Sequence, residues 1–346
     1  MIKPFRFLFL TLCFTIAILA VAQYVPPEDP FAIQNNNKLV SLDEISLPVL
    51  AKLKVRHVKS QPRFDIGLFG NSRSLNVGIH DLSLGDCKFF NFSVPSESFR
   101  FTVANLERFH EIGKAPRLAL ISIDHFELQH YNNPISFFAP TRWKMAIEDI
   151  KSGFMRDEIR SIDLLRMGWR HVWIEIVRFK RTFTPATFFK GISHLLSSSS
   201  TFSFVSPLSI GYQSDGSRRV PVPANKKEFQ TLIKPAQHQI DTGYFKYDIE
   251  RLARLQKDGI QVVIYESPLE PKSGLFFHNQ PTPQASRSRS TFVRACARMG
   301  LNCYTADPRR FIGNGGFWVN QTHPPSSVLG FYLNNLLDES QLACRR

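Results

Sequence analysis

The sequence predicts an α/β fold, a three-layer α/β/α domain built on a parallel sheet of about five strands. Short apolar runs alternate along the chain with segments of helical periodicity, a pattern typical of a parallel sheet covered on both faces. The chain has 346 residues, of which 43% are hydrophobic and 12% aromatic, which is enough for one large core. Ligands of such sheets lie at the carboxyl ends of the strands, so polar residues that follow a strand become the candidates for function.

The first half of the domain supplies two predicted helices and three predicted strands. A helix is expected over residues 42–57, and a second over 98–112, where apolar side chains recur at helical spacing. Strands are expected over residues 64–69, 88–94 and 117–123, which are apolar and short.

The second half repeats this alternation. Its predicted elements are a helix over 248–258, a strand over 260–265, a helix over 290–299, a strand over 301–304 and a closing helix after His323. Gly259 and Gly300 follow the first two helices, where a residue of positive φ commonly ends a helix. Cys296 and Cys303 flank the second of these turns and suit a local disulfide bridge in an oxidising compartment.

An apolar run near the start of the chain predicts export. Residues 7–22 are apolar and follow Lys3 and Arg6, the positive flank expected on the cytoplasmic side. Two outcomes stay open: residues 1–25 form an uncleaved signal anchor, or they include a signal peptide that is cleaved after Ala22.

Three parts are expected along the chain. After the membrane or signal segment, residues 26–60 are expected to form a proline-containing extended linker and a lead-in helix. Residues 61–340 are expected to form the α/β domain. Within it, residues 125–235 contain aromatic, helix-like pieces and a serine run, and we interpret them as a helical insertion over the carboxyl edge of the sheet.

The charge balance favours anionic partners. Lysine and arginine outnumber aspartate and glutamate by 43 to 29, for a formal net charge of +14. Such a surface suits an acidic polysaccharide or an anionic lipid. No run of basic residues is long enough for a nucleic-acid-binding arm, so nucleic acid is not an expected partner. No cysteine–histidine cluster has zinc-site spacing, and we expect neither a metal nor a cofactor.

Two residues at opposite ends of the domain suggest a nucleophile and its base. Ser72 follows the first strand at a turn expected to open a helix, where backbone N–H groups stabilise an anion. His323 precedes the last helix. Because histidine activates serine by taking its proton, we expect the two side chains to meet at the carboxyl edge of the sheet. Ser96 and Asp124 also follow predicted strands and are expected at this edge.

Four short segments carry a family resemblance. They read Gly-Asn-Ser-Arg-Ser at 70–74, Asn-Phe-Ser-Val-Pro-Ser at 91–96, Ile-Ser-Ile-Asp-His-Phe at 121–126 and Asn-Gln-Thr-His at 320–323. In this order the chain resembles the SGNH/GDSL hydrolase superfamily. It is most similar to the membrane-anchored, extracytoplasmic members linked to acylation, including O-acetylation, of cell-surface polysaccharide. The resemblance covers most of residues 60–338.

The resemblance implies a role for each matched residue. Ser72 would be the nucleophile and His323 the general base. The backbone N–H groups of Ser72 and Ser96 would hold the oxyanion. Asn71, beside the nucleophile, would offer a further donor, and Arg73 would contact an anionic group of the substrate.

Three departures from the family pattern bear on activity. Ser96 replaces the usual glycine of the second block, and the asparagine usual in the third block is absent. Asn320 stands where the family carries the aspartate that orients the histidine. Unless Asp124 or Asp307 takes that place, the histidine lacks a carboxylate partner and activity is expected to be low.

The resemblance therefore implies a serine esterase or an O-acyltransferase that acts on exported cell-surface polysaccharide. The alternative is a non-catalytic SGNH-like protein that binds glycan or serves as a scaffold in an envelope export or acylation complex, and Asn320 favours it. The expected location is the cell inner membrane, crossed once, with the main domain on the periplasmic side. Cleavage after Ala22 would make the protein secreted.

Overall fold

The computed structural model describes a subset of the chain, which includes most of the predicted strands and helices. The described residues are 29–32, 39–40, 47–95, 99–123, 204–205, 211–219, 242–271, 283–311, 318 and 323–339. Within them the chain has an α/β fold with a parallel sheet of five strands, so the predicted fold class is confirmed at this level.

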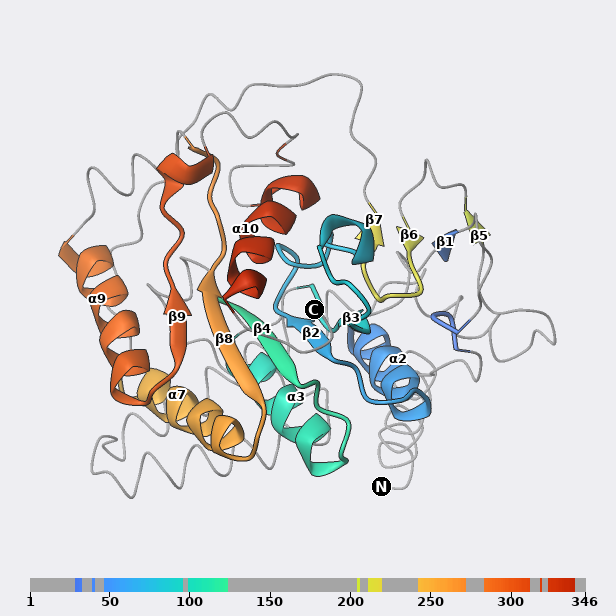
Figure 1. Ribbon diagram of the computed structural model, residues 1–346, viewed down its shortest axis with the longest axis horizontal. Coiled ribbons are helices and arrows are strands. Elements are labelled where there is room, and N and C mark those ends of the chain that lie inside the picture. The colour runs from blue at the N-terminus through green and yellow to red at the C-terminus, as the bar shows by residue number, and fades with distance from the viewer. Residues whose placement is uncertain are drawn as a thin grey trace, which may run out of the picture.

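The strand order of this sheet reverses beside its first strand. The order is β3-β2-β4-β8-β9, and each neighbouring pair is parallel. The chain therefore leaves β2 for β3 on one side and then returns to β4 on the other side (Figure 1). The strands are β2 (Ile66–Phe69), β3 (Phe89–Asn91), β4 (Leu118–Ile123), β8 (Gln261–Glu266) and β9 (Asn302–Tyr304).

Helices cover both faces of the sheet, because successive side chains of its central strands are apolar and point to opposite faces. On β4, Ala119 and Ile121 belong to one buried cluster, whereas Leu118 and Leu120 belong to a second. The first cluster includes side chains from four helices, and the second includes side chains of α10. Figure 1 shows the ribbons of these helices around the sheet. The helices are α2 (Leu47–Ser60), α3 (Phe99–Glu111), α7 (Thr242–Lys257), α9 (Pro283–Arg298) and α10 (Ser326–Asp338).

A second, small antiparallel sheet joins two distant parts of the sequence. Its order is β5-β1-β6-β7, so a strand before α2 pairs with strands from the end of the predicted insertion. Its strands are β1 (Leu39–Val40), β5 (Phe204–Val205), β6 (Gly211–Tyr212) and β7 (Arg218–Arg219). The rest of the predicted insertion lies outside the described residues.

Residues 29–32 pack against α2, a difference from the extended linker that the prolines predict. They form a turn in which the side chain of Phe31 is 2% exposed. The carboxylate of Asp29 lies 2.9 Å from Nδ1 of His57 on α2. Partial burial alone would raise the pKa of Asp29, but the hydrogen bond and charge of His57 and the N–H groups of this turn outweigh it, so the pKa lies below its ordinary value. Contacts from α2 thus hold the segment that precedes the domain.

Two further sequence expectations concern the disulfides and the membrane segment. Cys296 at the end of α9 and Cys303 in β9 form a disulfide bridge, as their spacing predicts. Cys87 is disulfide-bonded as well. Among the described residues no helix has the length and apolar character needed to cross a membrane, and the apolar run 7–22 lies outside them.

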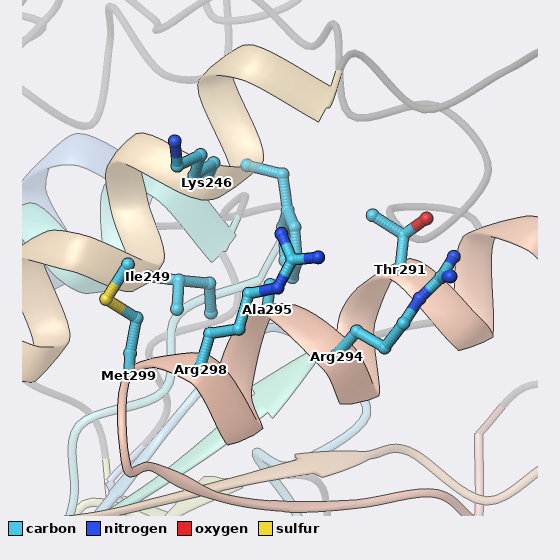
Figure 2. Close-up of a pocket in the computed structure, with 8 residues that line it drawn as sticks. Lys246, Ile249, Thr291, Arg294, Ala295, Arg298 and Met299 are labelled. Carbon is cyan, nitrogen blue, oxygen red and sulfur yellow. The ribbon is translucent and has the colours of Figure 1, made fainter.

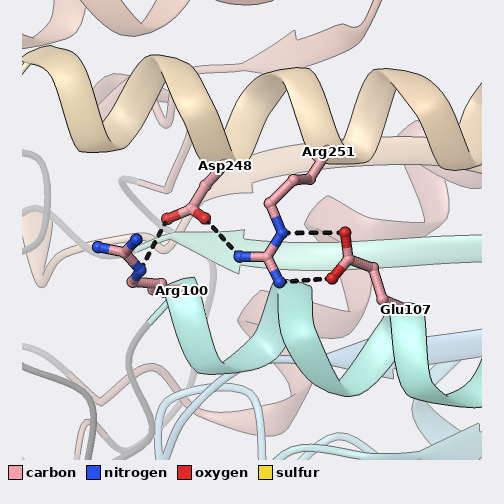
Figure 3. Close-up of polar contacts among 4 residues, drawn as sticks. All are labelled: Arg100, Glu107, Asp248 and Arg251. Atoms are coloured by element: carbon pink, nitrogen blue, oxygen red, sulfur yellow. Dashed lines mark hydrogen bonds and ion pairs between the residues drawn. The ribbon is translucent and has the colours of Figure 1, made fainter. Parts of the chain in front are cut away.

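A buried charge network fastens α3 to α7 (Figure 3). The guanidinium of Arg251 donates two hydrogen bonds to Glu107 and one, of 2.7 Å, to Asp248. Asp248 is fully buried and also faces the Nε atom of Arg100 at 3.8 Å. Burial alone would lower the pKa of Arg251, but the two carboxylates outweigh it and raise the pKa above its ordinary value. The carboxylate of Asp248 thus forms ion pairs with two buried arginines, Arg100 and Arg251.

Replacing Asp248 by alanine is expected to destabilise the fold. Breaking one partner of a buried ion pair costs about 3–5 kcal/mol, and the lower end applies because Arg251 keeps Glu107. The measurement is the free energy of unfolding in urea. Lys246→Ala, which removes an exposed charge from the same helix, is the control and should change that free energy by less than about 1 kcal/mol. Equal losses in the two variants would contradict a stabilising role for the network.

Candidate functional site at the carboxyl edge of the sheet

Ser72 lies just beyond β2, the strand beside which the order of the sheet reverses. The neighbours of β2 are β3 and β4, and the chain reaches them in opposite directions. In open α/β sheets, ligands bind beyond the carboxyl ends of the strands at such a switch point. The topology thus places Ser72 where this class of fold presents its ligands.

The side chains of Ser72 and His323 are in hydrogen-bonding contact. The Oγ atom of Ser72 lies 2.8 Å from the Nε2 atom of His323, although 251 positions separate the two residues in the sequence. Both side chains are half-buried. This distance allows direct proton transfer from the hydroxyl to the imidazole. The two side chains meet at this edge of the sheet, as the sequence analysis expects.

The turn that carries Ser72 is shaped by its neighbour Asn71. The side-chain oxygen of Asn71 accepts a hydrogen bond of 3.0 Å from the backbone N–H of Arg73, and its backbone oxygen accepts one of 3.2 Å from Ser74. Asparagine commonly bonds to the backbone two residues on, and this bond closes a tight turn. Asn71 therefore has a role in shaping the turn, which the sequence analysis did not assign. Arg73 is only 8% exposed, so most of this residue is buried.

Gly70 lets the turn approach β4 closely. A Cβ atom at this position would lie 2.7 Å from the Cβ of Ser122 and 2.8 Å from the Oγ of Ser74. No side chain fits in that space without a shift of the turn. The turn therefore sits directly against the end of β4.

Buried hydroxyl groups lie behind the turn. The Oγ of Ser74 is 2.9 Å from the hydroxyl of Tyr265, and the Oγ of Ser122 is 2.6 Å from that of Ser267. Complete burial raises the pKa of Tyr265 well above its ordinary value, although hydrogen bonds to Ser74 and Ser122 act the other way. Four buried hydroxyl groups thus lie behind the turn.

The helix that follows His323 packs against the loop that follows Ser72. A Cβ atom at Gly330 would lie 2.5 Å from the carbonyl oxygen of Asp81, so α10 touches the backbone of this loop. Asn334 accepts a hydrogen bond of 2.7 Å from the N–H of Ser83 and donates one of 3.3 Å to the oxygen of Asp81. The loop after Ser72 and the helix after His323 therefore form one packed unit.

Three of the predicted site residues lie outside the described residues. They are Ser96, Asp124 and Asn320. Asp307, the other predicted partner for the histidine, binds the guanidinium of Arg309 at 2.6–3.0 Å, and among the described residues no hydrogen bond joins it to His323. Glu266, a buried carboxylate at the end of β8, pairs with Arg289. Both carboxylates thus form ion pairs with arginines.

A cavity of about 300 Å³ lies elsewhere in the molecule, between α7 and α9. Ile249 and Met299 contribute apolar surface, and Figure 2 shows Lys246, Arg294 and Arg298 around it. None of the predicted site residues lines it. In the part of the chain that is described, no group of three or more histidine, cysteine or acidic residues is arranged to hold a metal ion.

Comparison with protein-family models, with curated proteins and with solved structures found no match to the chain. The functional assignment therefore rests on the residues of this chain, and above all on the contact between Ser72 and His323.

Replacing Gly330 by alanine is expected to destabilise the protein. In a helix interior this change ordinarily adds about 1 kcal/mol of stability. Here the added Cβ would meet the oxygen of Asp81 at 2.5 Å, and overpacking costs about 1–3 kcal/mol. Thermal unfolding should therefore show a lower midpoint. The control is Gly113→Ala, where a Cβ would meet nothing within 4 Å and only the strain of a positive φ applies. A midpoint for Gly330→Ala at or above that of the unchanged protein would contradict the close packing of α10.

Proposed function

We propose that the protein is a serine-dependent esterase or O-acyltransferase, with Ser72 as nucleophile and His323 as general base. The observation that carries the proposal is the 2.8 Å contact between the Oγ of Ser72 and the Nε2 of His323. Its place beyond β2, at the switch point of the sheet, supports the same interpretation. A serine that donates to an imidazole at such an edge is equipped for acyl transfer.

The proposed reaction has two balanced halves. The Oγ of Ser72 attacks the carbonyl carbon of an acyl ester while its proton passes to the Nε2 of His323. The resulting oxyanion is held by backbone N–H groups, for which Ser72 and Ser96 are the candidates. Collapse breaks the ester bond, and the imidazolium returns the proton to the leaving alcohol. A water molecule or a sugar hydroxyl then takes the acyl group from Ser72, again with His323 as base, and the free serine is restored.

The resemblance to the SGNH/GDSL superfamily is supported by the order of the elements along the chain as well as by the contact between Ser72 and His323. The sheet order, the serine after its first strand and the histidine before its last helix all agree with a chain of SGNH/GDSL type. We extend the proposal to the membrane-anchored members, and thus to an exported cell-surface polysaccharide as substrate. The net charge of +14 supports an anionic glycan as the substrate, either as the ester that is cleaved or as the acceptor of the acyl group.

The lead-in turn limits how far the domain can lie from a membrane. Only residues 26–28 separate the predicted membrane segment from the turn that starts at Asp29, and that turn is held by α2. Four peptide steps span at most about 14 Å. If residues 1–25 stay in the inner membrane, the domain is held against its periplasmic face. Such a position suits work on a polysaccharide during its export.

The competing proposal is a glycan-binding or scaffold protein without catalysis. It is favoured by Asn320, which stands where the family has the carboxylate that orients the histidine. Loss of that carboxylate slows a serine hydrolase but leaves a glycan-binding surface intact.

Labelling with a fluorophosphonate probe tests the proposal. The probe phosphonylates a serine that an adjacent base has activated, so we expect labelling of the unchanged protein and none of Ser72→Ala. His323→Gln should lower the labelling rate by at least about 100-fold, within the range that general-base catalysis contributes. Ser290→Ala, at an exposed serine of α9, is the matched control and should label normally. A folded protein that the probe does not label would support the scaffold proposal instead.

Restoring the family carboxylate with Asn320→Asp is expected to raise turnover of a small acyl ester. The inverse change in a well-studied serine protease lowers kcat by about 10⁴, so a gain of at least tenfold is expected here. A nearby anion also favours the protonated imidazole, which raises the pKa of His323 and moves the acidic limb of the pH–rate profile to higher pH. Adding Ser72→Ala should abolish the gain. An unchanged rate and profile would mean that another group already orients His323.

A further inference from the structure

The side chain of Asn91 binds backbone carbonyl groups of the loop that follows Ser72. Asn91 is the last residue of β3 and is fully buried. Its side-chain NH₂ group lies 2.9 Å from the carbonyl oxygen of Ser74, 3.2 Å from that of Leu75 and 2.8 Å from that of Val77, and its two hydrogens are shared among these three acceptors. Three carbonyls of one short loop therefore point at a single amide.

The orientation of this amide is determined by its other atom. The side-chain oxygen of Asn91 accepts a hydrogen bond of 2.9 Å from the backbone N–H of Ser93. Because an N–H can only donate, the oxygen must face Ser93 and the nitrogen must face the loop. A flipped amide would lose all of these hydrogen bonds, and each buried polar group left without a partner costs about 1–3 kcal/mol.

The backbone of Asn91 is held as firmly as its side chain. Its N–H donates to the oxygen of Asp215 at 2.7 Å, and its own oxygen accepts from the ammonium of Lys54 at 2.7 Å. Lys54 is 2% exposed and donates equally short bonds, of 2.7 Å, to the oxygens of Ser93 and Gly216. The donor that orders the loop is thus itself tied to α2 and to the turn between β6 and β7.

Ser72 lies between two anchored points of this loop. Before it, the oxygen of Gly70 accepts a hydrogen bond of 3.0 Å from the N–H of Val94. After it, Ser74 is held by Asn91 through its oxygen and by Asn71 through its N–H. The conformation of the turn, and with it the direction of the hydroxyl toward His323, depends on these anchors.

We infer that Asn91 is a positioning residue for Ser72: its side-chain amide holds the loop in the one arrangement that presents the hydroxyl to His323. The inference rests on the proposed function. Reaction rates depend steeply on the placement of the nucleophile, and a shift of about 1 Å can cost 100-fold. Removing the amide donor should therefore slow reaction at Ser72 in protein that is still folded.

Asn91→Asp tests this inference because it removes the donor and keeps the shape. The measurement is the second-order rate constant of fluorophosphonate labelling between pH 5 and 9, with folding checked by circular dichroism. We expect the variant to label 10- to 100-fold more slowly than the unchanged protein at pH 8, within the range for a displaced nucleophile. The ratio of the two rates should shrink at acidic pH, because a protonated carboxyl donates one hydrogen bond again.

The control is Asp248→Asn, the reciprocal exchange at a fully buried position of α7. It should lower the unfolding midpoint and leave labelling of the folded protein within about twofold, because Arg100 and Arg251, with which Asp248 forms ion pairs, belong to α3 and α7 and not to the loop of Ser72. If Asn91 has only a structural role, Asn91→Asp should likewise lower the unfolding midpoint and leave labelling of the folded protein within about twofold. Labelling of folded Asn91→Asp at the rate of the unchanged protein across the pH range would overturn the inference.

A second variant covers the case in which Asn91→Asp does not fold. Asn91→Ser leaves space for a water molecule to donate to part of the loop, and it should label more slowly than the unchanged protein, whereas an equal rate overturns the inference. If the unchanged protein is not labelled at all, the proposed function fails first. Hydrogen exchange at the amides of Ser74 and Val77 then tests the role of Asn91. Faster exchange in the variant than in the unchanged protein would support a role of Asn91 in ordering the loop, and equal exchange would overturn it.

Discussion

Two buried donors, the ammonium of Lys54 and the side-chain amide of Asn91, organise the backbone around the candidate site. Between them they bind six carbonyl oxygens, three each, from three separate stretches of chain. These stretches are the loop after Ser72, the end of β3 and the turn between β6 and β7. Buried backbone carbonyls need a hydrogen-bond donor, because a polar group left unpaired away from solvent costs free energy. One lysine and one asparagine meet that requirement and place the loops relative to one another.

The layers of the fold follow from patterns that a sequence displays directly. The apolar runs that become β4 and β8 are short, rich in branched side chains and bounded by polar or turn residues, which identifies them as buried strands. The sequence places Cys296 and Cys303 on either side of one turn, which permits a local bridge in an oxidising compartment, and the structure forms it. The predicted helix boundaries are less exact, since α7 and α9 begin six and seven residues before their predicted starts of 248 and 290. The first turn of α9 carries few apolar side chains, so periodicity does not reveal it.

Other features could not be predicted because they depend on distant partners. Lys54 is one of several basic residues of α2, and nothing in the local sequence indicates that three carbonyls would surround its ammonium. The second sheet pairs two-residue strands from positions about 165 apart, too short to show any period. Phe31 follows three prolines and suggests a linker, yet its ring stacks edge-on against His57 and Phe90. In each case the tertiary contact decides the structure, and the local sequence does not carry it.

The contact between Ser72 and His323 joins the two helical layers on opposite faces of the sheet. Ser72 belongs to a loop that Asn91 and Lys54 tie to α2, and α2 packs into the first buried cluster. His323 precedes α10, which packs into the second cluster and touches the same loop at Asp81. A shift of either helix relative to the sheet therefore changes the distance between the hydroxyl and the imidazole. Because the interiors of both clusters are close-packed, such shifts are resisted, and the hydroxyl–imidazole pair is held ready before any ligand binds.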